Sequence, residues 1–302
     1  MLGAARTDPA PSGPSGLRQF RAVLGAVSMG TTSSHQHNSE TAERSSVGAP
    51  SSAGSRPRSA LVAGSLFIAS TVAFMIAATV LSMTFDWPDI LREPADVVLP
   101  QFAAGGASLV WTWFAVAWTY AVLAVPILLL PTALARREDA ALRVATYLGA
   151  ASVLLALIGF LRWVFVVPTL ADSYTGGDEG TRSAVAAAWT AQHQYGGALL
   201  GEHLGQLLAI SWSVTVSVII LRSHVMPAWA GWLGLLASAL YLVNQGDILA
   251  TAVSGFPVWD LGGLLGSYLW AAWLLVLGVL LFRRVNGNVP IENSRTLPAE
   301  QS

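Results

Sequence analysis

Cysteine and lysine are both absent from this sequence of 302 residues. Without cysteine, the chain can form no disulfide bond, thiolate metal site, iron–sulfur cluster or cysteine nucleophile. Without lysine, all sixteen basic residues are arginine, which is typical of a GC-rich bacterial genome. The motifs HExxH and GxSxG are missing too, so the signatures of zinc proteases and serine hydrolases are absent. The sequence favours a protein that is not an enzyme.

Charge is also scarce. Charged residues make up 11% of the chain and hydrophobic residues 54%, whereas a soluble domain carries about 25% charged residues. A chain of this composition needs lipid, not water, around much of its surface. The formal net charge of −1 gives no indication of a nucleic-acid partner. The first partner that the composition predicts is therefore the lipid bilayer.

Long apolar stretches begin at Ala60. Each is long enough to cross a hydrocarbon core, which takes about 20 helical residues, and a helix satisfies its own backbone in lipid. We predict an all-α integral membrane bundle of six transmembrane helices at about 60–83, 108–130, 144–167, 196–221, 228–249 and 261–282.

The chain divides into three parts. Residues 1–59 are rich in Ser, Gly, Pro and Thr and lack an apolar period, so we expect a disordered cytoplasmic tail. Met29 is a candidate for the true start of the protein. Residues 60–284 form the transmembrane domain, and residues 285–302 are expected to be a second disordered cytoplasmic tail.

Arginine is distributed unequally between the ends of the predicted helices. With the N-terminus in the cytoplasm, eight arginines flank the cytoplasmic ends and two, Arg92 and Arg182, lie in external loops. Cytoplasmic loops of membrane proteins carry an excess of basic residues. We therefore expect a multi-pass protein of the bacterial cytoplasmic membrane with both termini in the cytoplasm.

Small residues recur at four-residue spacing in two of the predicted helices. Gly197, Gly201 and Gly205 follow one face of the fourth helix, and Gly262 and Gly266 follow one face of the sixth. Small residues allow helix backbones to approach closely in lipid. We expect contacts within the bundle, and a homo-oligomer through these glycine-lined helices is the alternative.

Two opposite charges fall inside predicted helices at the same depth. Arg162 lies six residues from the outer end of the third helix, and Glu202 lies six residues into the fourth, so each is about 9 Å below the outer boundary. Asn244 approaches this depth along the fifth helix, and Asp247 lies just outside it. Ionisable residues in a membrane need a partner or a function. We expect Arg162 and Glu202 to pair, directly or through Gln206 or Asn244.

A polar stripe follows the fourth helix. Glu202, Gln206, Ser213 and Ser217 fall within an arc of about 60° on an α-helix, and His203 is one residue away. Two interpretations remain. The charges are a structural ion pair that fixes helix register, or they belong to a polar pocket open to the outside. In the second, Arg162 holds an anionic or polar group, or Glu202 transfers a proton.

Cofactor sites are not indicated. A haem needs two axial ligands at one depth, but His203 is the histidine that lies well inside, and His193 and His224 are near opposite edges. His193 and His203 are also about 80° out of phase on an α-helix, which does not suit a zinc site. We predict no cofactor, no metal ligand and no catalytic residue.

Three segments carry a family resemblance: Asp86–Pro94, Gln194–Glu202 and Met226–Gly234. They resemble a family of bacterial multi-spanning proteins catalogued as domain of unknown function 4386, and the resemblance covers about residues 60–282. It implies an integral membrane protein of unassigned activity and transfers no site residue.

Three functional hypotheses follow. The first is small-solute binding or transport, with a polar or anionic solute in an outer pocket formed by Arg162, Glu202, His203, Gln206, Asn244 and Asp247. The second is a membrane partner or envelope-stress component without chemistry of its own. The third is an intramembrane enzyme.

Overall fold

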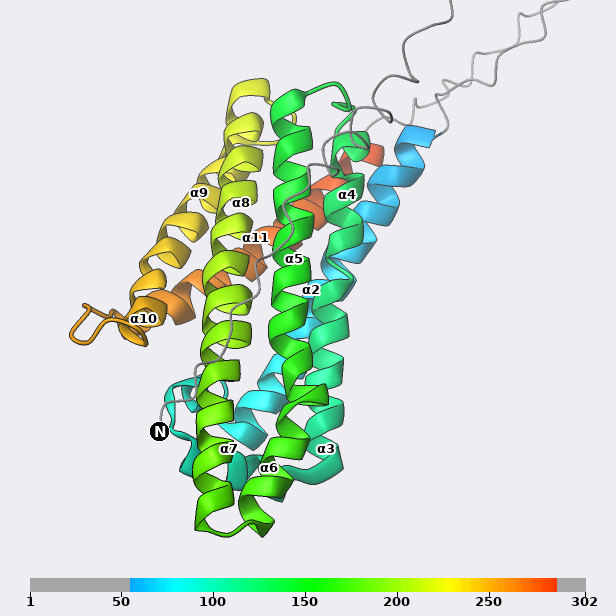
Figure 1. Cartoon of the computed structure of the whole chain (residues 1–302). Helices are drawn as coiled ribbons and strands as arrows, with labels where there is room; N and C mark the ends of the chain where they lie inside the picture. The colour runs from blue at the N-terminus through cyan, green and yellow to red at the C-terminus, as the bar shows by residue number, and fades with distance from the viewer. Residues whose placement is uncertain (1–54, 287–302) are drawn as a thin grey trace, which may run out of the picture. The chain divides into compact units, whose positions relative to one another are not determined.

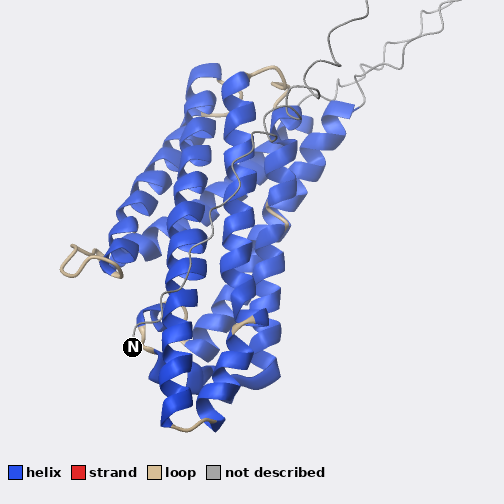
Figure 2. Ribbon diagram, viewed as in Figure 1, coloured by secondary structure: helices blue, strands red, loops and turns tan. Residues whose placement is uncertain are grey.

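The computed structural model describes residues 55–286, and all elements within this range are helical. Figure 2 shows helices joined by short loops, with no strand in the described part of the chain. Residues 1–54 and 287–302, which make up most of the two predicted tails, lie outside the described residues, whereas residues 55–59 and 285–286 are helical. Within the described range, the first helix begins at Ser55.

Twelve elements make up the described chain. They are α2 (Ser55–Phe85), η2 (Asp89–Arg92), α3 (Ala95–Ala121), α4 (Ala124–Ala133), α5 (Ala140–Phe165), α6 (Val167–Gly176), α7 (Glu179–Gln192), η3 (His193–Leu204), α8 (Gly205–Ser223), α9 (Ala228–Val243), α10 (Gln245–Ala250) and α11 (Asp260–Asn286). Several follow one another with little or no break, so that residues 55–286 contain six segments long and apolar enough to cross a membrane. The predicted all-α fold with six spanning helices is confirmed.

The helices pack as an antiparallel bundle (Figure 1). α2 contacts α3, α4 and α11, and α5 packs along α8 and the η3 segment that precedes it. α9 lies against both α8 and α11. The first residues of α2 and the last residues of α11 are at the same end of the bundle, as an even number of spans requires (Figure 1).

Three of the six segments are much longer than a membrane crossing needs. Ala95–Ala133 has 39 residues, Ala140–Gly176 has 37 and Glu179–Ser223 has 45, compared with about 20 for a hydrocarbon core. The regions predicted as external loops, about 84–107 and 168–195, are therefore mostly helical. In Figure 1, α3, α6 and α7 extend beyond the level of α10 at the lower end.

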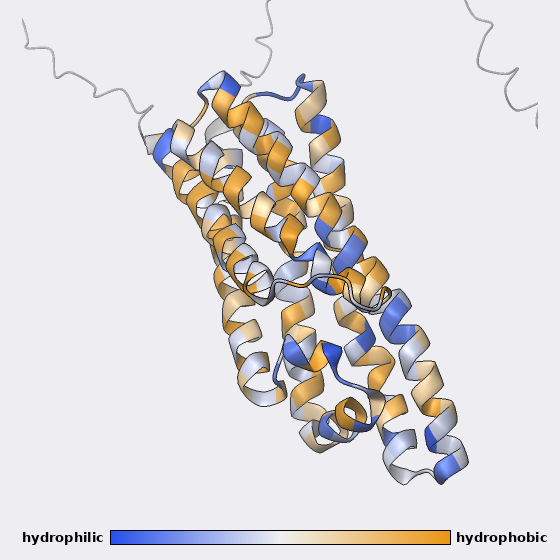
Figure 3. Cartoon of the chain, turned by 90° about the vertical axis from the view of Figure 1, so that its left-hand side faces the viewer, coloured by the Kyte–Doolittle hydropathy of each residue, from blue (hydrophilic) through white to orange (hydrophobic). Residues whose placement is uncertain are grey.

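Buried apolar side chains explain this extension. Val98, Leu99 and Phe102 on the first turns of α3 pack into a cluster with residues of α2, α5 and α7. The centre of the cluster is a parallel stack of Trp113 and Trp163, whose rings lie 4.7 Å apart. Figure 3 shows hydrophobic residues along most of the bundle and hydrophilic residues toward helix ends and in the lower part. A second buried cluster, around Trp212 and Trp273, holds the other end together.

Glycine and proline interrupt the long segments. Gly106 has a φ of +55° within α3, a conformation that glycine adopts without steric cost. The kink lies two residues before Ser108, where the spanning helix was predicted to start. Pro126 and Pro168 follow the breaks between α3 and α4 and between α5 and α6, since proline cannot donate the helical hydrogen bond.

Candidate functional site

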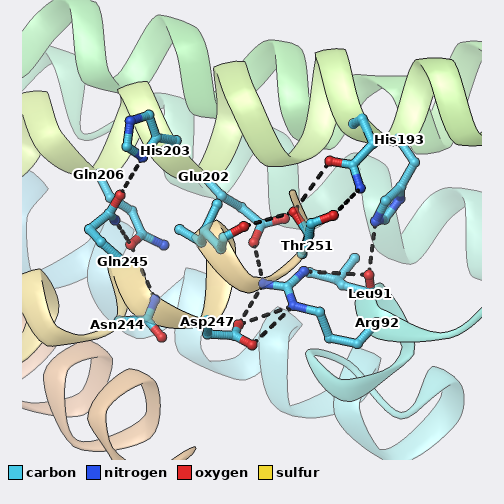
Figure 4. A network of polar contacts seen from close by, with 12 residues as sticks. Leu91, Arg92, His193, Glu202, His203, Gln206, Asn244, Gln245, Asp247 and Thr251 are labelled. Atoms are coloured by element: carbon cyan, nitrogen blue, oxygen red, sulfur yellow. Dashed lines mark hydrogen bonds and ion pairs between the residues drawn. The ribbon is translucent and has the colours of Figure 1, made fainter. Parts of the chain in front are cut away.

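Arg92 connects three separate elements, η2, η3 and α10 (Figure 4). Its Nη2 lies 2.7 Å from Glu202 Oε2 on η3 and 2.6 Å from Asp247 Oδ2 on α10. Its Nε also donates to both Asp247 oxygens, at 3.3 and 3.1 Å. Arg92 thus lies between two carboxylates that are 45 residues apart in the sequence.

Arg92 is an arginine shared by two carboxylates. Burial disfavours its charged form, but the facing carboxylates of Glu202 and Asp247 outweigh this effect and keep the pKa of Arg92 above its ordinary value. One cation therefore faces two carboxylates. The second oxygen of Glu202, Oε1, is buried and has no hydrogen-bond partner among the described residues. Arg162, which is buried nearby, is a second cation that acts on Glu202 through space, and Glu202 Oε1 remains an unused acceptor.

Glu202 and His203 lie on a π-helical segment. η3 extends over twelve residues, from His193 to Leu204, between α7 and α8. Such helices are rare, usually occur as single-turn bulges and are frequent at functional sites. The wider turn changes the directions in which the side chains point, so the α-helical phases that the sequence suggested for His193, Glu202 and His203 do not apply here.

His193 joins the segment between α2 and α3 to the bundle. Its Nε2 lies 2.8 Å from the carbonyl oxygen of Leu91, and its Nδ1 lies 3.4 Å from Arg162 Nη2. A carbonyl only accepts and a guanidinium only donates, so Nε2 carries the proton and Nδ1 does not. The ring is therefore neutral, and its bond to Leu91 holds the residue that precedes Arg92.

Arg162 is buried, with 6% of its surface exposed. Its Nη1 donates to the carbonyl oxygen of Gly159 at 2.8 Å, and its Nε has no partner in the described chain. The guanidinium lies against Gly197, where a Cβ atom would come within 2.5 Å of Nη2. A glycine at 197 therefore leaves the space that Arg162 fills.

The predicted direct pair of Arg162 and Glu202 is not formed. The ion-pair partner of Glu202 is Arg92, and the described residues contain no ion pair of Arg162 within 4.0 Å. The reason lies in the chain between α2 and α3, which folds back onto the bundle and brings Arg92 to Glu202. Sequence analysis had counted Arg92 as an external loop residue.

Amide side chains form a second polar layer next to the charges (Figure 4). His203 Nδ1 lies 2.7 Å from Gln245 Oε1, and Gln245 Nε2 donates to Gln206 Oε1 at 2.7 Å. Asn244 Nδ2 donates to the same Gln206 oxygen at 3.2 Å. Of the predicted pocket residues, His203, Gln206 and Asn244 thus meet in this layer, Glu202 and Asp247 meet at Arg92, and Arg162 lies in neither group.

A cavity of about 490 Å³ opens beside the carboxylates. Its polar lining includes Arg92, Glu93, His193, Gln194, Asp247 and Thr251. Gln194 and Thr251 also meet each other, with 3.3 Å between Thr251 Oγ1 and Gln194 Oε1. Asp247 is the predicted pocket residue among the lining groups. Sequence analysis missed Arg92, Gln194 and Thr251, although Arg92 was one of only two arginines in the predicted external loops.

The chain matches one known protein family. A family model described as a domain of unknown function (DUF4386) matches residues 62–278. The chain belongs to this family. The DUF4386 match includes every residue of the polar network from Arg92 to Thr251 and confirms the resemblance noted in the sequence. No curated protein and no solved structure matches the chain.

The DUF4386 assignment supports a polytopic membrane protein and gives no residue a role. Within residues 55–286, no group of three or more His, Asp or Glu side chains is arranged to hold a metal ion. Charged and amide side chains from η2, η3 and α10 converge on one cavity, an arrangement that suits non-covalent recognition.

Proposed function

We propose that this membrane protein binds a small polar solute in the cavity beside Arg92 and Asp247. The cavity itself carries the proposal, because its volume of about 490 Å³ falls in the range of about 300–1,000 Å³ that is usual for small-molecule sites. Its lining combines an arginine, two carboxylates, a histidine, an amide and two hydroxyls. Such a set recognises a polar ligand through hydrogen bonds and charge.

Transport of the solute is the second candidate function. Binding sites of secondary transporters are formed where helices are discontinuous. Here the π-helical segment η3 and the break between α9 and α10 at Asn244 lie side by side, joined by the bond between His203 and Gln245. A further break, between α5 and α6, follows Arg162 within a few residues. These three interruptions support a site whose walls change shape.

Solute binding can be tested by thermal unfolding of the purified full chain with a panel of cationic, neutral and anionic solutes. A ligand at 100 times its Kd adds about 2.7 kcal/mol of stability, which corresponds to a rise in Tm of about 5–10 °C for a chain of this size. The variant Ala95→Phe fills the cavity, which Ala95 lines. We expect it to remove the response to the ligand.

The matched control is Ala115→Phe, which places the same side chain at an exposed position of the same helix, α3. This variant should respond like the wild type. If no solute of any charge raises the Tm of the wild type, or if Ala95→Phe responds as strongly, the proposal is wrong. Uptake of a binding solute into proteoliposomes, absent in Ala95→Phe, would separate transport from binding alone.

A further inference from the structure

We infer that the solute carries a cationic nitrogen, such as a primary ammonium group, which takes the position of Arg92 Nη2 between Glu202 and Asp247. This inference rests on the proposed function and adds the chemical class of the ligand. The side chain of Arg92 already occupies this position, as a cation that belongs to the chain itself (Figure 4).

The position between the two carboxylates suits a nitrogen donor. Arg92 Nη2 lies 2.7 Å from Glu202 Oε2 and 2.6 Å from Asp247 Oδ2, distances typical of charge-assisted hydrogen bonds. An ammonium nitrogen has three N–H donors. Two of them can replace the bonds of Nη2, and a third remains for the unpartnered Glu202 Oε1 or for a group of the cavity wall.

The charge balance favours a cation over an anion. Of the residues that line the cavity, two are carboxylates, Glu93 and Asp247, and one is an arginine, Arg92. Glu202 does not line the cavity, and the buried Arg162 is the cation that offsets its charge. Arg162, the other arginine near the network, does not line the cavity, and its guanidinium is enclosed by the glycines at 159 and 197. His193 is neutral, with both ring nitrogens already engaged. An anion would therefore meet excess negative charge.

The side chain of Arg92 can leave its position between the two carboxylates. Its side chain is 28% exposed and lies at the end of a four-residue 3₁₀ helix. Asp247, which is 34% exposed, lies on the six-residue helix α10. Arg92 competes with the ligand for the same two carboxylates, so it sets the affinity of the site.

Two sources could supply the ammonium group: a free amine in solution, and the headgroup of an aminolipid in the membrane. Both present the same cationic nitrogen to the two carboxylates. The experiment below therefore uses soluble probes first and then changes the lipid.

The test measures binding of butylamine, butanol and butyrate to the full chain in phosphatidylglycerol nanodiscs by calorimetry. We expect butylamine to bind, and butanol and butyrate not to bind. Arg92→Gln removes the internal competitor and should tighten butylamine binding about tenfold. Glu202→Gln and Asp247→Asn should each weaken it about tenfold or more. Glu202→Asp keeps the charge and should retain most of the binding.

Asp172→Asn is the control, because Asp172 is an exposed carboxylate on α6 that does not line the cavity. It should bind butylamine like the wild type. If Glu202→Gln does not fold, Asp247→Asn and Arg92→Gln still decide the question. Adding phosphatidylethanolamine to the nanodiscs should raise the apparent Kd of butylamine if the lipid headgroup is the natural source, and leave it unchanged if the source is a free amine.

The inference is overturned if Arg92→Gln weakens butylamine binding, or if the neutralised carboxylates bind it as well as the wild type does. If butyrate or butanol binds and Ala95→Phe abolishes that binding, the inference of a cationic ligand is wrong, but the proposed solute site remains. If no solute binds, charged or neutral, both the proposed solute site and the inferred cationic ligand are wrong.

Discussion

Asp139 shows at the residue scale how one side chain can begin a helix. It occupies the N-cap of α5, where its Oδ1 accepts a hydrogen bond of 3.1 Å from the backbone N–H of Leu142. Its Oδ2 lies 3.0 Å from Arg136 Nη2. The backbone bond from Leu142 is the main reason that the pKa of Asp139 lies below its ordinary value, and Arg136 adds to it.

We predict that Asp139→Ala lowers the free energy of unfolding by about 1 kcal/mol at pH 7, the usual cost of losing an N-cap. Because the pKa of Asp139 is lower in the folded state, its ionised form contributes stability above the unfolded pKa of about 3.9. That contribution is lost as the pH falls through the folded pKa. The Tm difference between wild type and variant should therefore shrink below pH 4.

Asp139→Asn is the control for this experiment. Its amide oxygen can accept the same bond from Leu142 but does not ionise, so its Tm offset from Asp139→Ala should not change with pH. A wild-type advantage that stays constant down to pH 3 would show that the ionised carboxylate is not what stabilises α5.

The residues of the candidate site were predictable only in part. Glu202, Asn244 and Asp247 stand out because polar groups are costly within apolar helices. Arg92 does not stand out, because a charged residue in a predicted loop is ordinary, and its contacts with Glu202 and Asp247 depend on a fold-back of the chain. The pairing of Arg162 with Glu202 was inferred from depth alone, and equal depth does not fix the direction in which a side chain points.

At the scale of elements, two glycines form a tight helix crossing near the site. A Cβ atom on Gly159 of α5 would lie 2.9 Å from the Cα of Gly201 on η3, and a Cβ on Gly201 would lie 3.0 Å from the Cα of Gly159. Both obstacles are backbone atoms, which cannot rotate away. The predicted use of Gly201 as an internal packing residue is consistent with this crossing.

We predict that Gly159→Ala destabilises the protein by about 1–3 kcal/mol, because the added methyl group must push α5 and η3 apart. Thermal unfolding of the purified variant measures the loss. Gly176→Ala is the matched control, since a Cβ at Gly176 meets no atom within 4 Å. Equal Tm values for the two variants would contradict the proposed tightness of the crossing.

The π-helical segment explains why the local geometry of the site could not be predicted. Hydrophobic periodicity assumes 3.6 residues per turn, and nothing in the run from His193 to Leu204 indicates a wider turn. The kink at Gly106 and the breaks before Pro126 and Pro168 are each caused by a glycine or proline that can be read in the sequence. Element boundaries were therefore predictable where glycine or proline interrupts a helix, but the change of helix type was not.

At the scale of the whole molecule, composition was sufficient to predict the fold class. Six apolar stretches predicted six spans, and the described residues contain six segments that are long and apolar enough to cross a membrane. The lengths of the second, third and fourth spans were underestimated because their outer turns are less apolar than the membrane core. They are stabilised by contacts with one another, such as Trp163 with Trp189, and such contacts are not visible in a hydropathy profile.

We predict that both ends of the bundle face the cytoplasm, on the basis of the eight-to-two distribution of arginine. Reporter fusions after Arg137, Ser223 and Arg284 should report the cytoplasm. Fusions after Glu93 and Asp178 should report the opposite side. An external signal from the fusion after Arg284 would contradict this topology and would place the cavity on the cytoplasmic face.

The long helical segments also have a mechanical consequence. Glu179–Ser223 is one helical segment of 45 residues, so a tilt at the glycine crossing would be amplified along it. A tilt of about 10° there would displace a point about 30 Å away by about 5 Å. A small rotation at the crossing would thus become a much larger displacement at the first turn of α7.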